Sequence, residues 1–106
     1  MPRAADLAVT NTESDVVAAA RSRARIRIAG TVTKNVDGYS ASYRNRTLEI
    51  AAAGTAVRVT ASPSSRLGNA ETGTFVDLAA TMTGIADLAD GIYVARDAQL
   101  IALVEQ

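Results

Sequence analysis

Residues Ala24–Val36 read A-R-I-R-I-A-G-T-V-T-K-N-V, and this stretch decides the fold. Ile26, Ile28 and Val32 share one parity, and arginines and threonines occupy the other. A period of two is typical of a strand with one buried face. Gly30 stands where a strongly bent strand favours a residue without a side chain. We therefore predict a long, bent first strand.

A similar string returns at Phe75–Gly84, F-V-D-L-A-A-T-M-T-G, and predicts a second strand of the same kind. Arg27 of the first copy aligns with Asp77 of the second, so the two copies share a plan but differ in charge. The same alternation predicts five strands in all. They are Ala24–Val36, Tyr39–Ile50, Thr55–Ala61, Thr74–Gly84 and Ile92–Ala95, the last continuing through Ala98–Val104.

Two features concern the first hairpin. Asp37-Gly38 is a strong turn signal, so we expect the first strand to end there. In the second strand the alternation breaks, because Tyr39 and Tyr43 share one parity and Leu48 has the other. We therefore expect a bulge near Arg44–Arg46, or a turn at that point that splits the segment in two.

A short helix is predicted ahead of the first strand. Thr12 can cap the segment Glu13–Ser22, and Asp15 follows it at the spacing of a capping pair. We expect this helix to close one end of the barrel and residues 1–11 to form a flexible arm.

These elements predict an all-β fold. They match the pattern of a five-stranded OB-fold barrel, with five strands, a leading helix and a longest connection over residues 62–73. The 106 residues suit one domain, which we place at residues 12–106. Ile85–Asp90 is expected to be a linker that tucks Leu88 under the barrel.

The amino-acid composition argues against several classes of function. The chain has no cysteine and no histidine, so it lacks thiolate ligands, the common zinc ligand and the usual general base. We expect no enzymatic activity, no catalytic residue, no metal and no cofactor. No apolar run approaches the length of a membrane span, and we expect a cytoplasmic protein without a membrane partner.

Charge is distributed unevenly along a chain whose net charge is zero. Residues 21–66 carry nine basic and two acidic side chains, and residues 67–106 carry one basic and six acidic ones. Such a split indicates an anionic ligand for the basic half. The alternative is that the two halves pair with each other or with a neighbouring subunit.

The spacing of glycine and apolar residues resembles one family. Arg27–Tyr39, Thr55–Val59, Gly73–Ile85 and Gly91–Ile101 resemble small bacterial OB-fold proteins of the tRNA-anticodon-binding-like group. The resemblance spans roughly Thr12–Leu103 and implies the fold rather than a set of tRNA-binding residues. The chain departs from the family pattern at Ala79-Ala80, where glycine is usual, and in the connection between the third and fourth strands.

The candidate binding residues are basic and aromatic. Arginine neutralises phosphate, and an exposed tyrosine offers a stacking platform for a base, so they predict binding of single-stranded DNA or RNA. One alternative is that the tyrosines belong to the core and the arginines form a solvated face. Another is an oligomerising structural or adaptor protein without a nucleic-acid ligand. The candidate residues are Arg25, Arg27, Lys34, Tyr39, Tyr43, Arg44, Arg46 and Arg58.

Overall fold

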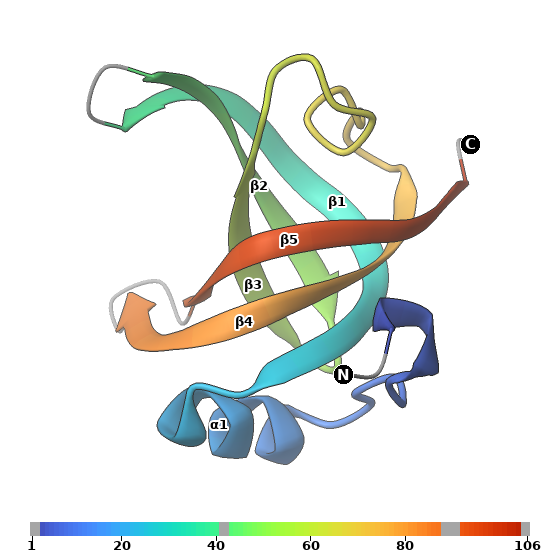
Figure 1. The fold of residues 1–106 in the computed structure, drawn as a ribbon, viewed down its shortest axis with the longest axis vertical. Helices are drawn as coiled ribbons and strands as arrows, with labels where there is room; N and C mark the ends of the chain where they lie inside the picture. The colour runs from blue at the N-terminus through green and yellow to red at the C-terminus, as the bar shows by residue number, and fades with distance from the viewer. Residues whose placement is uncertain (1–2, 41–42, 88–91, 105–106) are drawn as a thin grey trace.

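The computed structural model describes residues 3–40, 43–87 and 92–104, although the side chains of residues 38–40, 43–44 and 84–87 fall outside the description. Five strands form a closed barrel in the order β1-β2-β3-β5-β4 (Figure 1). Neighbouring strands are antiparallel except β3 and β5, which are parallel. This order confirms the predicted OB-type barrel. The strands are β1 (Arg25–Ser40), β2 (Tyr43–Ala52), β3 (Thr55–Ala61), β4 (Phe75–Asp87) and β5 (Ile92–Val104).

β1 is the longest strand and joins the two halves of the barrel. Its first part, Arg25–Thr31, pairs with β4, and the part from Thr31 to Ser40 pairs with β2. Gly30 lies next to the change of partner. A Cβ atom there would stand 2.0 Å from the carbonyl oxygen of Ala51, so the two strands approach too closely for any side chain. The sequence expectation for Gly30 is confirmed, and its physical reason is this close approach.

Two expectations for the first hairpin are wrong. β1 continues through Asp37-Gly38, which pair with Arg46 and Asn45 of β2, and the pairing extends to Ser40 and Tyr43. The register shift lies in β1 between Val32 and Lys34 rather than near Arg44–Arg46. Tyr39 belongs to β1 rather than to β2, so no bulge is needed to explain a break of alternation within β2. An ion pair between Asp37 and Arg46, 2.6 Å long, stabilises the strand where the local signal favours a turn.

Of the last three strands, only β4 extends beyond its expected end. β4 continues to Asp87, and so includes the first residues of the expected linker; Leu88 lies outside the described residues. β5 is one strand through Val104, with Asp97 at a positive φ of 54° where the sequence suggested an interruption. β3 has the predicted bounds.

The barrel interior is aliphatic, as the alternation predicts. Val76, Leu78, Ala80 and Met82 of β4 are all buried, while Ile26 is only partly buried. The remaining fully enclosed side chains come from the other strands and from the helix. The largest of these are Val16, Ile28, Val32, Leu48, Ile50, Val57 and Val59.

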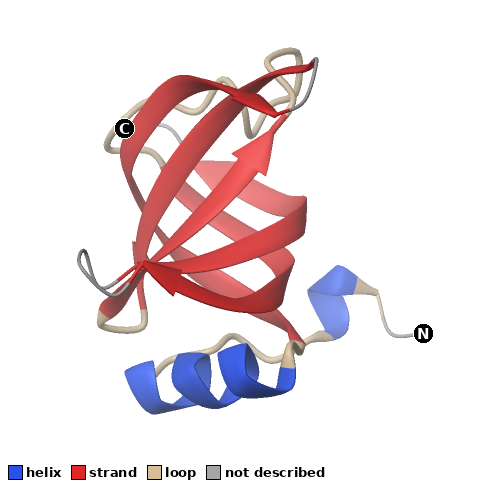
Figure 2. Ribbon diagram, turned by 90° about the vertical axis from the view of Figure 1, so that its left-hand side faces the viewer, coloured by secondary structure: helices blue, strands red, loops and turns tan. Residues whose placement is uncertain are grey.

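Two different elements close the ends of the barrel. Helix α1 (Glu13–Ser22) begins at Thr12, whose hydroxyl accepts a hydrogen bond from the Asp15 backbone amide at 3.2 Å. It buries Val16, Ala19 and Ala20 below the barrel, as predicted (Figure 2). The connection between β3 and β4 lies at the other end of the barrel (Figure 1). It contributes Leu67 and Ala70 to the core through a series of turns.

The segment expected to form a flexible arm lies against β1. This segment contains a short 3-10 helix, η1 (Ala4–Asp6), and its Val9 forms an isolated parallel bridge with Arg27. The Thr10 amide donates to the Arg27 carbonyl at 2.8 Å. This contact covers part of β1 ahead of the point where β2 begins to pair with it, and so protects an edge that would otherwise be open.

Candidate nucleic-acid interface

The first group of charged residues forms a row across three strands. Lys34 of β1 pairs in register with Glu49 of β2, and Glu49 pairs with Arg58 of β3. The Glu49 carboxylate lies 3.9 Å from the lysine ammonium and 3.6 Å from the arginine guanidinium. Leu48 and Ile50, on either side of Glu49, point into the core, so this row lies on the outer surface. Both cations of the row therefore approach the same carboxylate, that of Glu49.

Arg27 has a different environment. Its Nε and Nη2 atoms donate to the two carboxylate oxygens of Asp77 at 2.9 and 2.6 Å. Its Nη1 atom donates to the carbonyl oxygens of Ala5 and Leu7. The hydrogen bond to Asp77 raises the pKa of Arg27 above its ordinary value. The residues that differ in charge between the two sequence copies are therefore partners, and Arg27 also anchors the N-terminal segment.

Arg25 also lies away from the outer row. Its guanidinium donates to the Thr81 hydroxyl at 3.1 Å and to the Asp97 carbonyl at 3.0 Å. These partners belong to β4 and β5, on the side of β1 away from β2. The structure thus separates Arg25 and Arg27 from Lys34 and Arg58.

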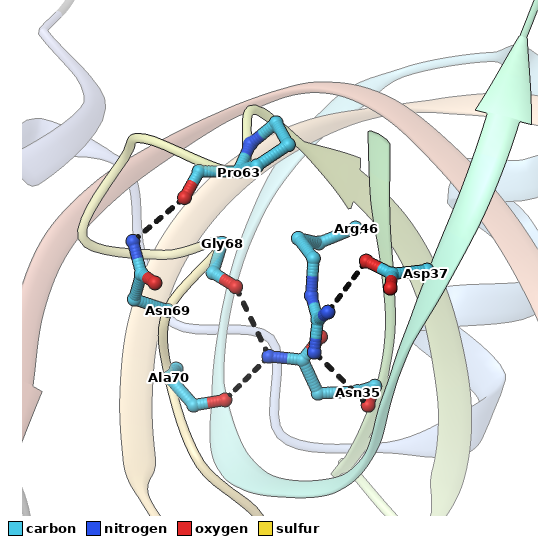
Figure 3. Close-up of polar contacts among 7 residues, drawn as sticks. All are labelled: Asn35, Asp37, Arg46, Pro63, Gly68, Asn69 and Ala70. Carbon is cyan, nitrogen blue, oxygen red and sulfur yellow. Dashed lines mark hydrogen bonds and ion pairs between the residues drawn. The ribbon is translucent and has the colours of Figure 1, made fainter. Parts of the chain in front are cut away.

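Arg46 belongs to a third group, at the loop-covered end of the barrel (Figure 3). Its Nε atom donates to the Asn35 side-chain oxygen at 2.8 Å, and its Nη1 atom donates to Asp37 at 2.6 Å. The Asn35 amide in turn donates to the carbonyl oxygens of Gly68 and Ala70, at 3.1 and 2.6 Å. This network ties the β1–β2 hairpin to the connection between β3 and β4.

The hairpin also carries three candidates whose side chains fall outside the described part of the chain. They are Tyr39, Tyr43 and Arg44. Their backbones lie in β1 and β2, where Tyr39 is the partner of Arg44 and Ser40 is the partner of Tyr43. Both tyrosines are therefore near the end of the hairpin, beyond the row of Lys34 and Glu49 along the same two strands.

Sequence reasoning overlooked Glu49, Asn35 and Asp37 as partners of the candidate cations. The signal for Glu49 was present, since Leu48 and Ile50 mark it as outward on the second strand. The predicted turn at Asp37-Gly38 removes Asp37 from the paired part of the hairpin and leaves Asn35 at its end, so neither residue could be matched with Arg46.

The described residues also bear on metal binding and on membrane crossing. Within residues 3–40, 43–87 and 92–104 there is no cluster of three or more residues suited to hold a metal ion. The helices among these residues are too short or too polar to cross a membrane. Comparisons with family models, curated proteins and solved structures find no match to this chain.

Replacing Arg27 by alanine should release the N-terminal segment. The Thr10 amide should then exchange its hydrogen faster, because the side chain that fixes Ala5 and Leu7 is gone. Hydrogen–deuterium exchange followed by mass spectrometry measures this. Arg25→Ala, two residues away on the same strand, serves as the matched control, because its guanidinium donates to Thr81 and Asp97 rather than to the Ala5 and Leu7 carbonyls. Equal protection of Thr10 in both variants would contradict an anchoring role.

Proposed function

We propose that this protein binds single-stranded nucleic acid, without catalysing a reaction, through the outer surface of β1, β2 and β3. The observation that carries the proposal is the row of Lys34, Glu49 and Arg58. Its side chains come from three adjacent strands, and both cations lie on the outer surface beside the Glu49 carboxylate. Adjacent strands are about 4.8 Å apart, so the two basic residues lie about 10 Å apart across the sheet. A sugar–phosphate backbone can contact both.

The two strands that carry Lys34 and Glu49 support the same proposal. The hairpin formed by β1 and β2 continues from the row toward Tyr39, Tyr43 and Arg44. A cationic track beside aromatic rings is the combination by which proteins hold single strands without reading their sequence. Because Arg25 and Arg27 contact β4, β5 and the N-terminal segment, the proposed surface does not include them.

Glu49 provides the sharpest test. Glu49→Gln removes the charge that Lys34 and Arg58 share, so binding of a labelled single strand should become tighter. Lys34→Ala removes one phosphate contact, so binding should weaken severalfold and the slope of log affinity against log salt should fall by about 0.7. Fluorescence anisotropy across a salt series measures both effects.

Two variants on α1 control for a change in overall charge. Glu13→Gln and Arg21→Ala alter exposed residues of the helix below the barrel and should leave affinity close to that of the wild type. No binding by the wild-type protein at low salt and micromolar concentration would overturn the proposal. Equal effects of Glu49→Gln and Glu13→Gln would show that only the overall charge matters.

An oligomerising structural or adaptor role is the second candidate, and β5 favours it. Among the described residues, β5 pairs with β3 only over Ile92–Val94, so its later part has a strand partner on one side only. Phe75 and Val104, which are partners between β4 and β5, are both exposed, at 39% and 57%. An unpaired edge beside apolar side chains can accept a strand from a second copy. Light scattering after size exclusion distinguishes the two candidates: a dimer that Val104→Lys dissociates, with no affinity for a single strand, favours this one.

A further inference from the structure

A polar pocket lies between the β1–β2 hairpin and the connection from β3 to β4. Its volume is about 550 Å³, which is within the range of small-molecule sites. The hairpin contributes Asn35 and Arg46, and the connection contributes the remaining wall. Figure 3 shows Arg46 and Asn35 facing the loop that carries Pro63, Gly68 and Asn69.

Arg46 presents hydrogen-bond donors in a fixed orientation. Of its five N–H groups, three donate to the Asn35 side-chain oxygen, to Asp37 and to the Asn35 carbonyl. Asn35 is itself held by the carbonyl oxygens of Gly68 and Ala70. Within the described chain, two N–H groups of Arg46 therefore remain for a ligand, one on each Nη atom. A carbonyl oxygen is a suitable acceptor for them.

The connection supplies a hydrogen-bond acceptor at the rim of the same pocket. Glu71 lines the pocket and is exposed, and within the described chain its carboxylate has no hydrogen bond or ion pair. Asp37 forms an ion pair with Arg46, and Glu71 adds a second carboxylate beside the same pocket. A phosphate is disfavoured there, whereas a neutral group that donates an N–H is favoured.

We propose that this pocket receives one base of the bound strand, a base that carries a carbonyl oxygen next to a ring N–H. Thymine, uracil and guanine have this edge; cytosine and adenine have an unprotonated ring nitrogen beside an amino group instead. The carbonyl accepts from Arg46, the ring N–H donates to Glu71, and Pro63 provides an apolar wall. Single-stranded bases are commonly recognised on this edge. The inference rests on the proposed function.

The test compares two strands that differ only in the base. Oligothymidylate and oligocytidylate of about twelve nucleotides have the same backbone and are within the length that an OB fold can occupy. The wild-type protein should bind oligothymidylate about tenfold more tightly, the discrimination expected of one well-formed pair of hydrogen bonds. Glu71→Ala should reduce that ratio to about one. Glu71 is exposed in the connection, so the variant should keep the fold.

Glu13→Ala is the matched control, because it removes the same charge from an exposed position on α1 and should preserve the ratio. Equal binding of the two strands by the wild type would overturn the base pocket and leave the proposed function standing. A preference for oligothymidylate that persists in Glu71→Ala would also overturn the base pocket. Failure to bind either strand would overturn both proposals.

Discussion

Replacing Gly30 by alanine should destabilise the protein by about 3 kcal/mol, at the upper end of the usual cost of overpacking a core. The new Cβ atom would lie 2.0 Å from the Ala51 carbonyl oxygen and 2.8 Å from its carbonyl carbon. Both obstacles are backbone atoms of β2, so no side-chain rotation can relieve the contact. The two strands would have to separate at the point where β1 changes partner. Urea unfolding followed by circular dichroism measures the loss.

Gly54→Ala is the comparison for this experiment. A Cβ atom at Gly54 meets nothing within 4 Å, but the residue has a φ of 75°. Its replacement should cost about 1 kcal/mol from the left-handed backbone alone. The difference between the two variants isolates the steric term at Gly30. Equal losses would mean that β1 and β2 can move apart at little cost.

The second large effect is expected at Leu67. Its side chain is 4% exposed and belongs to the barrel core, although it comes from a connection built of turns. Leu67→Ala should cost about 3 kcal/mol, within the range found for buried leucines. The measurement is again the free energy of unfolding in urea. The result would show that this connection closes its end of the barrel as α1 closes the other.

Arg66→Ala is the matched control, because Arg66 is the exposed neighbour of Leu67 in the same connection. An exposed substitution away from special features usually changes stability by less than about 0.5 kcal/mol. If Leu67→Ala were equally mild, the connection would be a loose covering rather than a part of the core.

The sequence predicts the barrel well because burial and alternation are coupled. Val57, Val59, Val76 and Leu78 follow a period of two, and only one face of each strand can be inward. α1 was predictable because its cap and its apolar side are both local in sequence. The identity of the fold therefore follows from short-range signals repeated along the chain.

The partners of the charged residues were harder to predict. Alternation shows that Arg27 and Asp77 face outward, but only the register of β1 against β4 shows that their side chains are close enough to form an ion pair. At Asp37 a local turn signal competes with pairing across the hairpin, and the pairing with Arg46 prevails. Register depends on strands distant in sequence, so a basic residue cannot be judged available for a ligand before its neighbours across the sheet are known.

The brief parallel pairing of β3 with β5 has a consequence for how the chain folds. β1, β2 and β3 are consecutive and antiparallel, so their contacts close short loops. The described pairs between β3 and β5 join residues 36 positions apart, as Ala56 and Ile92 do, and they number three. Closing a long loop costs conformational entropy, and only a few hydrogen bonds between β3 and β5 offset that cost. We therefore expect β1, β2 and β3 to pair with one another early in folding. The pairing of β3 with β5 should form last. The same pairing should be the first to open in the native state.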